Sequence, residues 1–185
     1  RWKHAREIGL HPKLKEIRCF YPQLLRRNLR HLEASALPIA IPNALAGKLP
    51  KIPMIDDGQF AAIAIPHASS VTQDHFFEFL KLSLNYCKRN HITPLLKFHP
   101  NDRVGPEIVK KHSPDSPEIP QWMPLELFMF SHAQVSTFIG TRTSALHISK
   151  AICPGVNCIY YDRSHSTRGQ EWADFLDAVG VSRLS

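Results

Sequence analysis

The chain has 185 residues, of which 43% are apolar and 21% are charged, a balance typical of folded proteins and not of disordered ones. This length allows one well-buried domain, or one domain with an appendage. No apolar run approaches the ~20 residues that cross a bilayer, and the N-terminus lacks the apolar core of a secretory signal. The chain begins without Met, which favours a processed or truncated protein.

The formal net charge of +7 is concentrated near the N-terminus. Residues 1–30 contain two acidic side chains against nine basic ones, namely Arg1, Lys3, Arg6, Lys13, Lys15, Arg18, Arg26, Arg27 and Arg30. Such a segment would be attracted to a polyanion or an acidic membrane surface, or it could be the solvated face of a helix. Nucleic acid is not predicted as a partner, because no DNA- or RNA-binding motif accompanies the charge.

The four cysteines, Cys19, Cys87, Cys153 and Cys158, do not have the spacing of zinc ligands, so no metal site is predicted. Three of them fall in segments with the pattern of buried helices or strands, where cysteine acts as a small core residue. Unpaired cysteines favour a reducing, cytoplasmic environment.

The first 58 residues are predicted to form a segment of two parts. Apolar residues recur at roughly helical spacing over residues 1–35, with breaks at Pro12 and Pro22. Four prolines and a glycine then predict an extended connector over residues 36–58. We therefore expect a basic helical segment and a Pro-rich connector before the main domain.

From residue 59 onward, predicted strands and helices alternate. Short apolar runs predict strands over residues 60–65, 93–98, 135–139 and 159–161. Amphipathic patterns predict helices over residues 74–88, 104–112, 124–130, 144–151 and 171–178, with Pro124 as the first helical residue. This alternation favours a parallel sheet, so residues 59–185 are predicted to be one Rossmann-like α/β nucleotide-binding domain.

Polar residues follow three of the predicted strands. His67, Ser69 and Ser70 follow the first, His99 follows the second, and residues 141–144 follow the third. Open parallel sheets bind ligands outside the carboxyl ends of their strands. The sequence therefore predicts a cleft at this edge, which would bind a phosphate-bearing donor.

The run from Gly140 to Ser144 is typical of a phosphate site at a helix N-terminus. Gly140 permits a tight turn, and Thr143 or Ser144 can cap the helix that follows. Free backbone N–H groups, hydroxyls and the helix dipole favour a bound phosphate. The same residues would also suit a helix cap without a ligand.

His99 and the pair Asp56 and Asp57 are candidates for acid–base chemistry. A histidine at a strand end can donate to a phosphate or act as a general acid, and Pro100 would keep its loop stiff. One of the two aspartates could be a general base, although Asp-Gly is also common in exposed turns. A structural role for His99 remains the alternative.

Four motifs occur in a characteristic order: Asp56-Asp57-Gly58, Lys97-x-His99-Pro100, Pro124-Leu-Glu126-Leu-Phe and Gly140-x-x-Thr143-Ser144-Ala-Leu. In this order they resemble the motifs of bacterial sialyltransferases and polysialyltransferases. Those enzymes have a two-domain GT-B fold and transfer sialic acid from CMP-sialic acid with inversion, without a metal. The resemblance covers residues 56–151. It implies that residues 59–185 are the C-terminal, donor-nucleotide half of a GT-B glycosyltransferase and that residues 1–58 are a remnant of the acceptor-side domain.

The resemblance also implies roles for individual residues. His99 would contact the CMP phosphate and assist its departure, while Thr143 and Ser144 would hold the same phosphate. Glu126 would bind the ribose, and Asp56 or Asp57 would deprotonate the acceptor hydroxyl. Lys97, Pro100 and Gly140 would complete the donor-nucleotide site, and CMP-sialic acid would be the donor substrate with no further cofactor.

The implied acceptor is a capsule or lipooligosaccharide glycan, modified on the cytoplasmic side of the membrane. Residues 1–30 could then bind the inner membrane face peripherally. Two alternatives remain open: a CDP-glycerol-type glycerophosphotransferase of cell-wall polymer synthesis, and an inactive nucleotide-binding or scaffold module.

Overall fold

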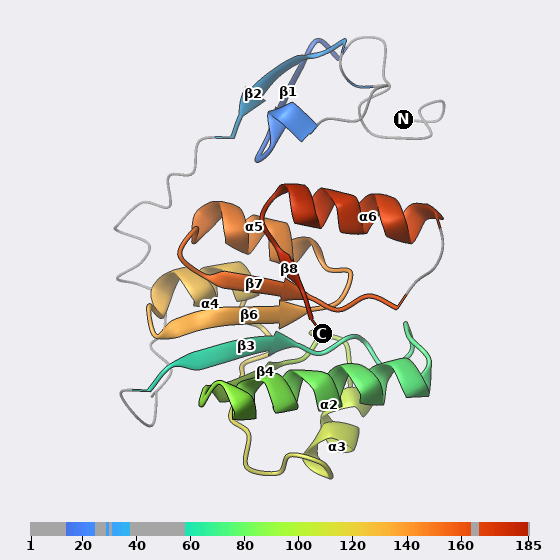
Figure 1. The fold of residues 1–185 in the computed structure, drawn as a ribbon, viewed down its shortest axis with the longest axis vertical. Helices are drawn as coiled ribbons and strands as arrows, with labels where there is room; N and C mark the ends of the chain where they lie inside the picture. Colours follow the sequence, from blue (N-terminus) through green and yellow to red (C-terminus); the bar gives the residue numbers. More distant parts are fainter. Residues whose placement is uncertain (1–13, 25–28, 30, 38–57, 164–166, 185) are drawn as a thin grey trace. The chain divides into compact units, whose positions relative to one another are not determined.

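The computed structural model describes residues 14–24, 29, 31–37, 58–163 and 167–184. Contacts divide the chain into two compact units, Arg1–Ala40 and Ile41–Ser185. Figure 1 shows the strands of the first unit and the layered α/β architecture of the second. Each unit is described by itself.

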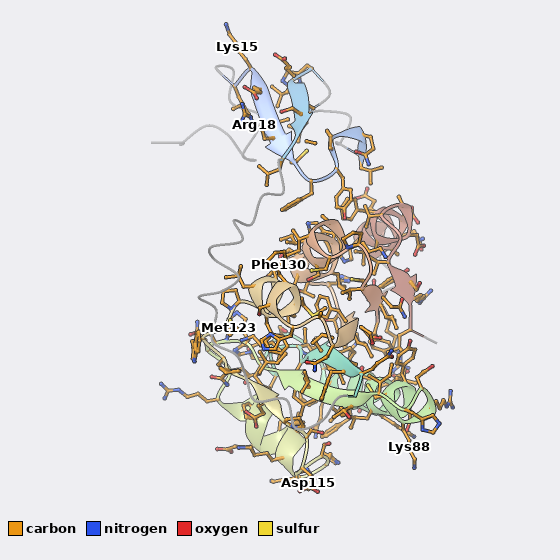
Figure 2. All side chains as sticks on the ribbon, turned by 90° about the vertical axis from the view of Figure 1, so that its left-hand side faces the viewer. Lys15, Arg18, Lys88, Asp115, Met123 and Phe130 are labelled. Atoms are coloured by element: carbon orange, nitrogen blue, oxygen red, sulfur yellow. The ribbon has the colours of Figure 1, made fainter. Side chains whose placement is uncertain are left out.

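The first unit contains two short strands, β1 (Glu16–Cys19) and β2 (Glu33–Ala36), which pair in parallel. A 3₁₀ helix, η1 (Pro22–Leu24), follows β1. The predicted helix is therefore wrong for the described residues of this segment. Side-chain exposure alternates along β1, as expected for a strand. The backbone of β1 pairs with β2 although the apolar residues of this segment have an approximately helical spacing. Lys15 and Arg18 project from this unit as exposed basic side chains (Figure 2).

The second unit is built on a six-stranded parallel sheet with strand order β5-β4-β3-β6-β7-β8. Its strands are β3 (Phe60–Ala64), β4 (Thr93–Lys97), β5 (Glu118–Ile119), β6 (Val135–Gly140), β7 (Asn157–Tyr160) and β8 (Ser182–Arg183). The connecting helices are α2 (Gln73–Arg89), α3 (Val104–Lys110), α4 (Leu125–Ser131), α5 (Ser144–Ile152) and α6 (Thr167–Ala178). The prediction of a parallel α/β domain is confirmed, and the architecture is compatible with a Rossmann-like fold.

Helices cover both faces of this sheet, with α2 and α3 on one face and α4, α5 and α6 on the other (Figure 1). The central strand β3 supplies side chains to both cores in alternation. Ala61 and Ile63 pack in the cluster with α2, whereas Phe60 and Ala62 pack in the cluster with α4, α5 and α6. A strand buried on both faces must be apolar throughout, which explains why β3 appears in the sequence as a continuous apolar run.

The termini of α2 show why the helix begins and ends where it does. The Thr72 side chain accepts a hydrogen bond from the His75 backbone N–H at 3.3 Å, which caps the first turn. Asp74 lies in that turn, and Lys88 and Arg89 lie in the last turn. These charges complement the helix dipole at both ends.

The order of the strands reverses beside β3. The chain runs outward through β4 and β5, then crosses to β6 on the other side of β3 and continues to β7 and β8. In open parallel sheets, such a reversal separates the loops at the carboxyl edge and creates the usual ligand crevice. Here the reversal lies between β3 and β6.

Most predicted elements of the second unit are confirmed within one or two residues at most ends, and α6 begins four residues before its predicted start. The strands β5 and β8 were not predicted, since two residues are too few to show a periodic pattern. Pro124 is the N-cap of α4 and not its first residue. Within the part of the chain that the structure describes, no helix has both the length and the hydropathy needed to cross a membrane.

Candidate functional site

The polar residues that follow β3, β4 and β6 lie at the carboxyl edge of the sheet. In the register of the sheet, Ala64 of β3 is opposite Lys97 of β4, and Ile63 is opposite Ile139 of β6. The loops after β4 and β6 therefore leave the sheet at the same level, on either side of the loop after β3. Because neighbouring strands are about 4.8 Å apart, β4 and β6 are separated by about 10 Å. The topology thus brings the loops that carry His99 and Thr143 to the same edge.

His67 and His99 contact each other at this edge. Their ring centroids are 5.5 Å apart in an edge-to-face arrangement. The Nδ1 atom of His67 accepts a hydrogen bond from the Ser69 backbone N–H at 3.2 Å, and Nδ1 of His99 accepts one from the Asn101 backbone N–H at 3.2 Å. A neutral imidazole with Nδ1 as acceptor carries its proton on Nε2, so each ring retains an N–H donor for a ligand.

A buried carboxylate joins the loops that carry the two histidines. Asp102 is only 2% exposed. Its Oδ2 accepts a hydrogen bond at 3.1 Å from the backbone N–H of Ala68, which lies in the loop after β3. Its Oδ1 accepts from the N–H groups of Val104 and Gly105 at 3.1 and 2.9 Å, at the start of α3. A Cβ atom at Gly105 would lie 2.5 Å from Oδ2, so glycine is required for this close approach.

The hydrogen bonds to Asp102 also favour its charged form. Burial is the largest single influence and raises the pKa of the Asp102 carboxyl, but the three N–H donors and the nearby His67 together outweigh it. The pKa therefore lies below its ordinary value. The sequence analysis did not select Asp102. Its position two residues before a predicted helix is the signal that could have identified it as a capping residue.

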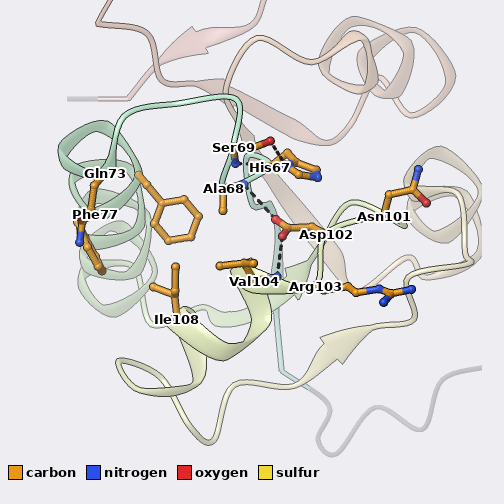
Figure 3. A pocket seen from close by; sticks show the side chains of 11 residues that line it. His67, Ala68, Ser69, Gln73, Phe77, Asn101, Asp102, Arg103, Val104 and Ile108 are labelled. Carbon is orange, nitrogen blue, oxygen red and sulfur yellow. Dashed lines mark hydrogen bonds between the residues drawn. The ribbon is translucent and has the colours of Figure 1, made fainter.

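A pocket of about 590 Å³ lies between α2 and α3, beside this pair of loops (Figure 3). Its apolar wall contains Phe76, Phe77, Val104 and Ile108, and its polar residues include His67, Ser69, Gln73, Asn101, Asp102 and Arg103. Val104 is 56% exposed although it is apolar. This volume is within the usual range of small-molecule sites.

The run from Gly140 to Ser144 forms the predicted turn and helix cap. Thr143 is the N-cap of α5, and its hydroxyl accepts from the Ala145 backbone N–H at 3.3 Å. Ser144 is exposed as the first residue of the helix. A Cβ atom at Gly140 would lie 3.0 Å from the Thr143 methyl group, so glycine lets the cap residue pack against the strand end. The cap leaves the Ser144 hydroxyl at the surface.

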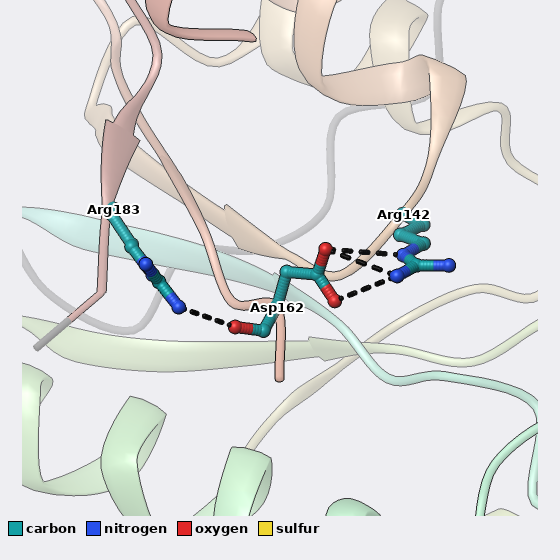
Figure 4. A network of polar contacts seen from close by, with 3 residues as sticks. All are labelled: Arg142, Asp162 and Arg183. Carbon is teal, nitrogen blue, oxygen red and sulfur yellow. Dashed lines mark hydrogen bonds and ion pairs between the residues drawn. The ribbon is translucent and has the colours of Figure 1, made fainter. Parts of the chain in front are cut away.

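A second buried carboxylate, that of Asp162, connects the loops that follow β6 and β7 (Figure 4). Arg142 donates to both carboxylate oxygens of Asp162 at 3.1–3.2 Å, in the bidentate geometry that arginine favours. Arg183 donates to the Asp162 backbone oxygen at 2.9 Å. Asp162, which follows β7, is thereby joined both to Arg142 in the loop after β6 and to Arg183 in β8. No local motif in the sequence marks Asp162, because its partners are distant in the chain.

Lys97 is held by backbone carbonyls. It is 8% exposed, and its Nζ donates to the oxygens of Pro120 and Gln121 at 2.9 and 2.7 Å. Burial lowers the pKa of Lys97, and the negative charge of Glu126 partly offsets the shift. Glu126 lies in the first turn of α4, after the carboxyl end of β5. Lys97 thus holds the segment that leads to Glu126.

The remaining predicted residues are Pro100, which is exposed after His99, and the two aspartates. Asp56 and Asp57 lie outside the described residues. Gly58, the third residue of that motif, is exposed before β3.

Comparison with known proteins leaves the site as the main basis for interpreting function. No protein-family model matches the chain, and no curated protein has a detectably similar sequence. Among the described residues, no group of three or more His, Cys, Asp or Glu side chains could hold a metal ion.

Proposed function

We propose that residues 59–185 bind the CMP part of CMP-sialic acid and act as the donor half of an inverting, metal-independent glycosyltransferase. The acceptor would be a capsule or lipooligosaccharide glycan. The observation that carries this proposal is the common edge of the sheet: His99 follows β4 and the capped N-terminus of α5 follows β6, on either side of the strand where the order reverses. Nucleotides bind at such reversals in parallel sheets.

The proposed chemistry depends on charge that develops on the departing CMP phosphate. An Nε2–H donor from His99 and the N–H groups at the start of α5 would stabilise that charge as the glycosidic bond breaks. The hydroxyl of Ser144 would add a further donor. Glu126 would accept hydrogen bonds from the ribose hydroxyls, and the bonds from Lys97 to the Pro120 and Gln121 carbonyls would hold the segment that leads to it.

Binding of nucleotides to the full chain tests this proposal. Calorimetric titration should show that CMP binds, that CMP-sialic acid binds at least as tightly, and that UMP binds about tenfold more weakly or not at all. Each lost base-specific hydrogen bond costs about 1–3 kcal/mol, which corresponds to a factor of ten or more. Preference for CDP and CDP-glycerol would instead favour the glycerophosphotransferase. Failure to bind any cytidine nucleotide would contradict both enzymes.

Asp57 is proposed as the base that deprotonates the acceptor hydroxyl, with Asp56 as the alternative. Replacing Asp57 with Asn should lower the transfer rate by about 10²-fold or more, because a positioned base contributes 10²–10⁴-fold, while CMP binding should not change. A transfer assay from CMP-sialic acid together with calorimetry measures both. The matched control is Asp115→Asn, on an exposed loop residue (Figure 2). Unchanged transfer by both Asp57→Asn and Asp56→Asn would remove this motif from the mechanism.

The basic residues of the first unit are proposed to contact an acidic membrane surface. Lys15 and Arg18 are exposed, although Arg18 donates to Glu16 at 2.8 Å and so has part of its charge satisfied within β1. Attraction of this kind weakens as salt rises.

A further inference from the structure

His67 is only partly buried and lies in the loop after β3. Its ring lines the pocket between α2 and α3 and contacts His99 edge-on at 5.5 Å. Among the described residues, the partners of its Nδ1 are the Ser69 N–H and, at 2.9 Å, the Ser69 hydroxyl, both in its own loop. The side chain is therefore oriented by the loop after β3, in the same way that the Asn101 N–H orients His99 after β4.

Two imidazoles in contact can offer two donors to one anion. Each neutral ring retains an Nε2–H donor. Arg103, an exposed basic residue, is also among the residues that line the adjoining pocket.

The two loops are also fixed relative to each other. Asp102, three residues after His99, accepts from the N–H of Ala68, the residue after His67. The same carboxylate is held by the N–H groups of Val104 and Gly105, so it has little freedom to move. Asp102 is thus placed to set the spacing between the two histidines.

We propose that His67 is a second phosphate-binding histidine, that it binds the donor phosphate together with His99, and that Asp102 is the positioning residue for the pair. The proposal rests on the proposed function for the identity of the donor, but the phosphate site itself requires only the histidine geometry. The ligand class is a phosphate monoester or diester, and the first probe is inorganic phosphate.

Long-range ¹H–¹⁵N NMR of the full chain tests the pair directly. In the free protein, the ¹⁵N shifts of both rings should show the neutral tautomer protonated at Nε2 when the pH is high enough to deprotonate them. Added phosphate, and separately CMP, should move the resonances of both rings with a single dissociation constant. Movement of His99 without His67 would overturn the proposal.

Two replacements of His67 separate its Nε2 donor from a merely structural role. His67→Asn removes the donor and should weaken the binding of phosphate and CMP about tenfold or more, whereas His67→Gln places an amide donor near the former Nε2 position and should restore much of the affinity. The matched control is His91→Asn, at the opposite end of β4 with φ = 55°, a conformation that Asn tolerates. Equal losses for Asn and Gln would contradict the donor role.

Asp102→Asn tests the positioning role by a readout that stability alone would not change. In the folded variant, the NMR signals should show that phosphate moves His67 and His99 with two different dissociation constants, because the loops are no longer joined as before. Retention of one shared constant would overturn the positioning role.

If phosphate moves both rings in the wild type but no cytidine nucleotide binds, the histidine pair stands and the proposed nucleotide is wrong. If CMP binds with wild-type affinity to His67→Asn, the nucleotide stands and the role of His67 is wrong.

Discussion

His99→Ala is expected to abolish measurable transfer of sialic acid from CMP-sialic acid and to weaken CMP binding about tenfold. The variant loses both a hydrogen bond to a charged phosphate, worth about 1.5–3 kcal/mol, and the group proposed to assist departure of CMP. His99 is exposed, and its Nδ1 bond is to its own loop, so the fold should not depend on it. Calorimetry and a transfer assay measure the two effects separately.

The double variant Thr143→Ala and Ser144→Ala provides the comparison. It should weaken donor binding with a smaller effect on the rate at saturating donor, since these residues are proposed to hold the phosphate and not to assist its departure. It should also lower stability by about 1 kcal/mol, because the cap bond to the Ala145 N–H is lost. His91→Asn, on the residue that lies just before β4 and away from the carboxyl edge, serves as the control. Wild-type transfer by His99→Ala would show that the site is wrongly assigned.

Asp102→Ala is expected to lower the free energy of unfolding by about 2–4 kcal/mol. The replacement leaves three backbone N–H groups without their acceptor, and a buried donor without a partner costs about 1–3 kcal/mol. Urea unfolding followed by circular dichroism at neutral pH measures the change. Asp115→Ala, in an exposed loop, should change it by less than about 0.5 kcal/mol.

The same carboxylate should make stability sensitive to acid. The pKa of Asp102 is lower in the folded chain than in the unfolded chain, so its contribution is complete above the unfolded value, near pH 4. As the pH falls further, through the lower folded pKa, the contribution is lost. The difference in stability between wild type and Asp102→Asn should therefore shrink as the pH falls below about 4. A difference that stayed constant from pH 7 to pH 3 would contradict this role.

The sequence predicts the α/β domain well because its elements carry strong local patterns. The strand β3 is buried on both faces and therefore appears as an unbroken apolar run, and α2 combines an apolar face with a capping threonine. For the described residues of the first unit, the helical prediction is wrong because the two strands have four residues each, too few for alternation to stand out from spaced leucines and isoleucines.

The site was predicted less completely, since its organisation depends on contacts between loops that are distant in the chain. Strand ends identified His67 and His99 as candidates, but their contact follows from the adjacency of β3 and β4. The bonds of Asp162 to Arg142 and Arg183, and the bond of Asp102 to Ala68, join residues that only the topology brings together, so no local pattern reveals them. The bonds of Asp102 to Val104 and Gly105 form a local helix cap. Lys97 was assigned to the donor site, and its bonds to the Pro120 and Gln121 carbonyls could not be foreseen because β5 was not predicted.

The two-residue strands at the outer edges of the sheet affect how copies of the domain can associate. An exposed strand edge can pair with another chain, and short edge strands limit this risk. On one side, β5 covers only the last two residues of β4, and Pro94 in the uncovered part has no N–H to donate. On the other side, Arg183 of β8 is a charged edge residue. Self-association through sheet extension is therefore disfavoured, and any contact between copies of this domain should use helix faces or loops.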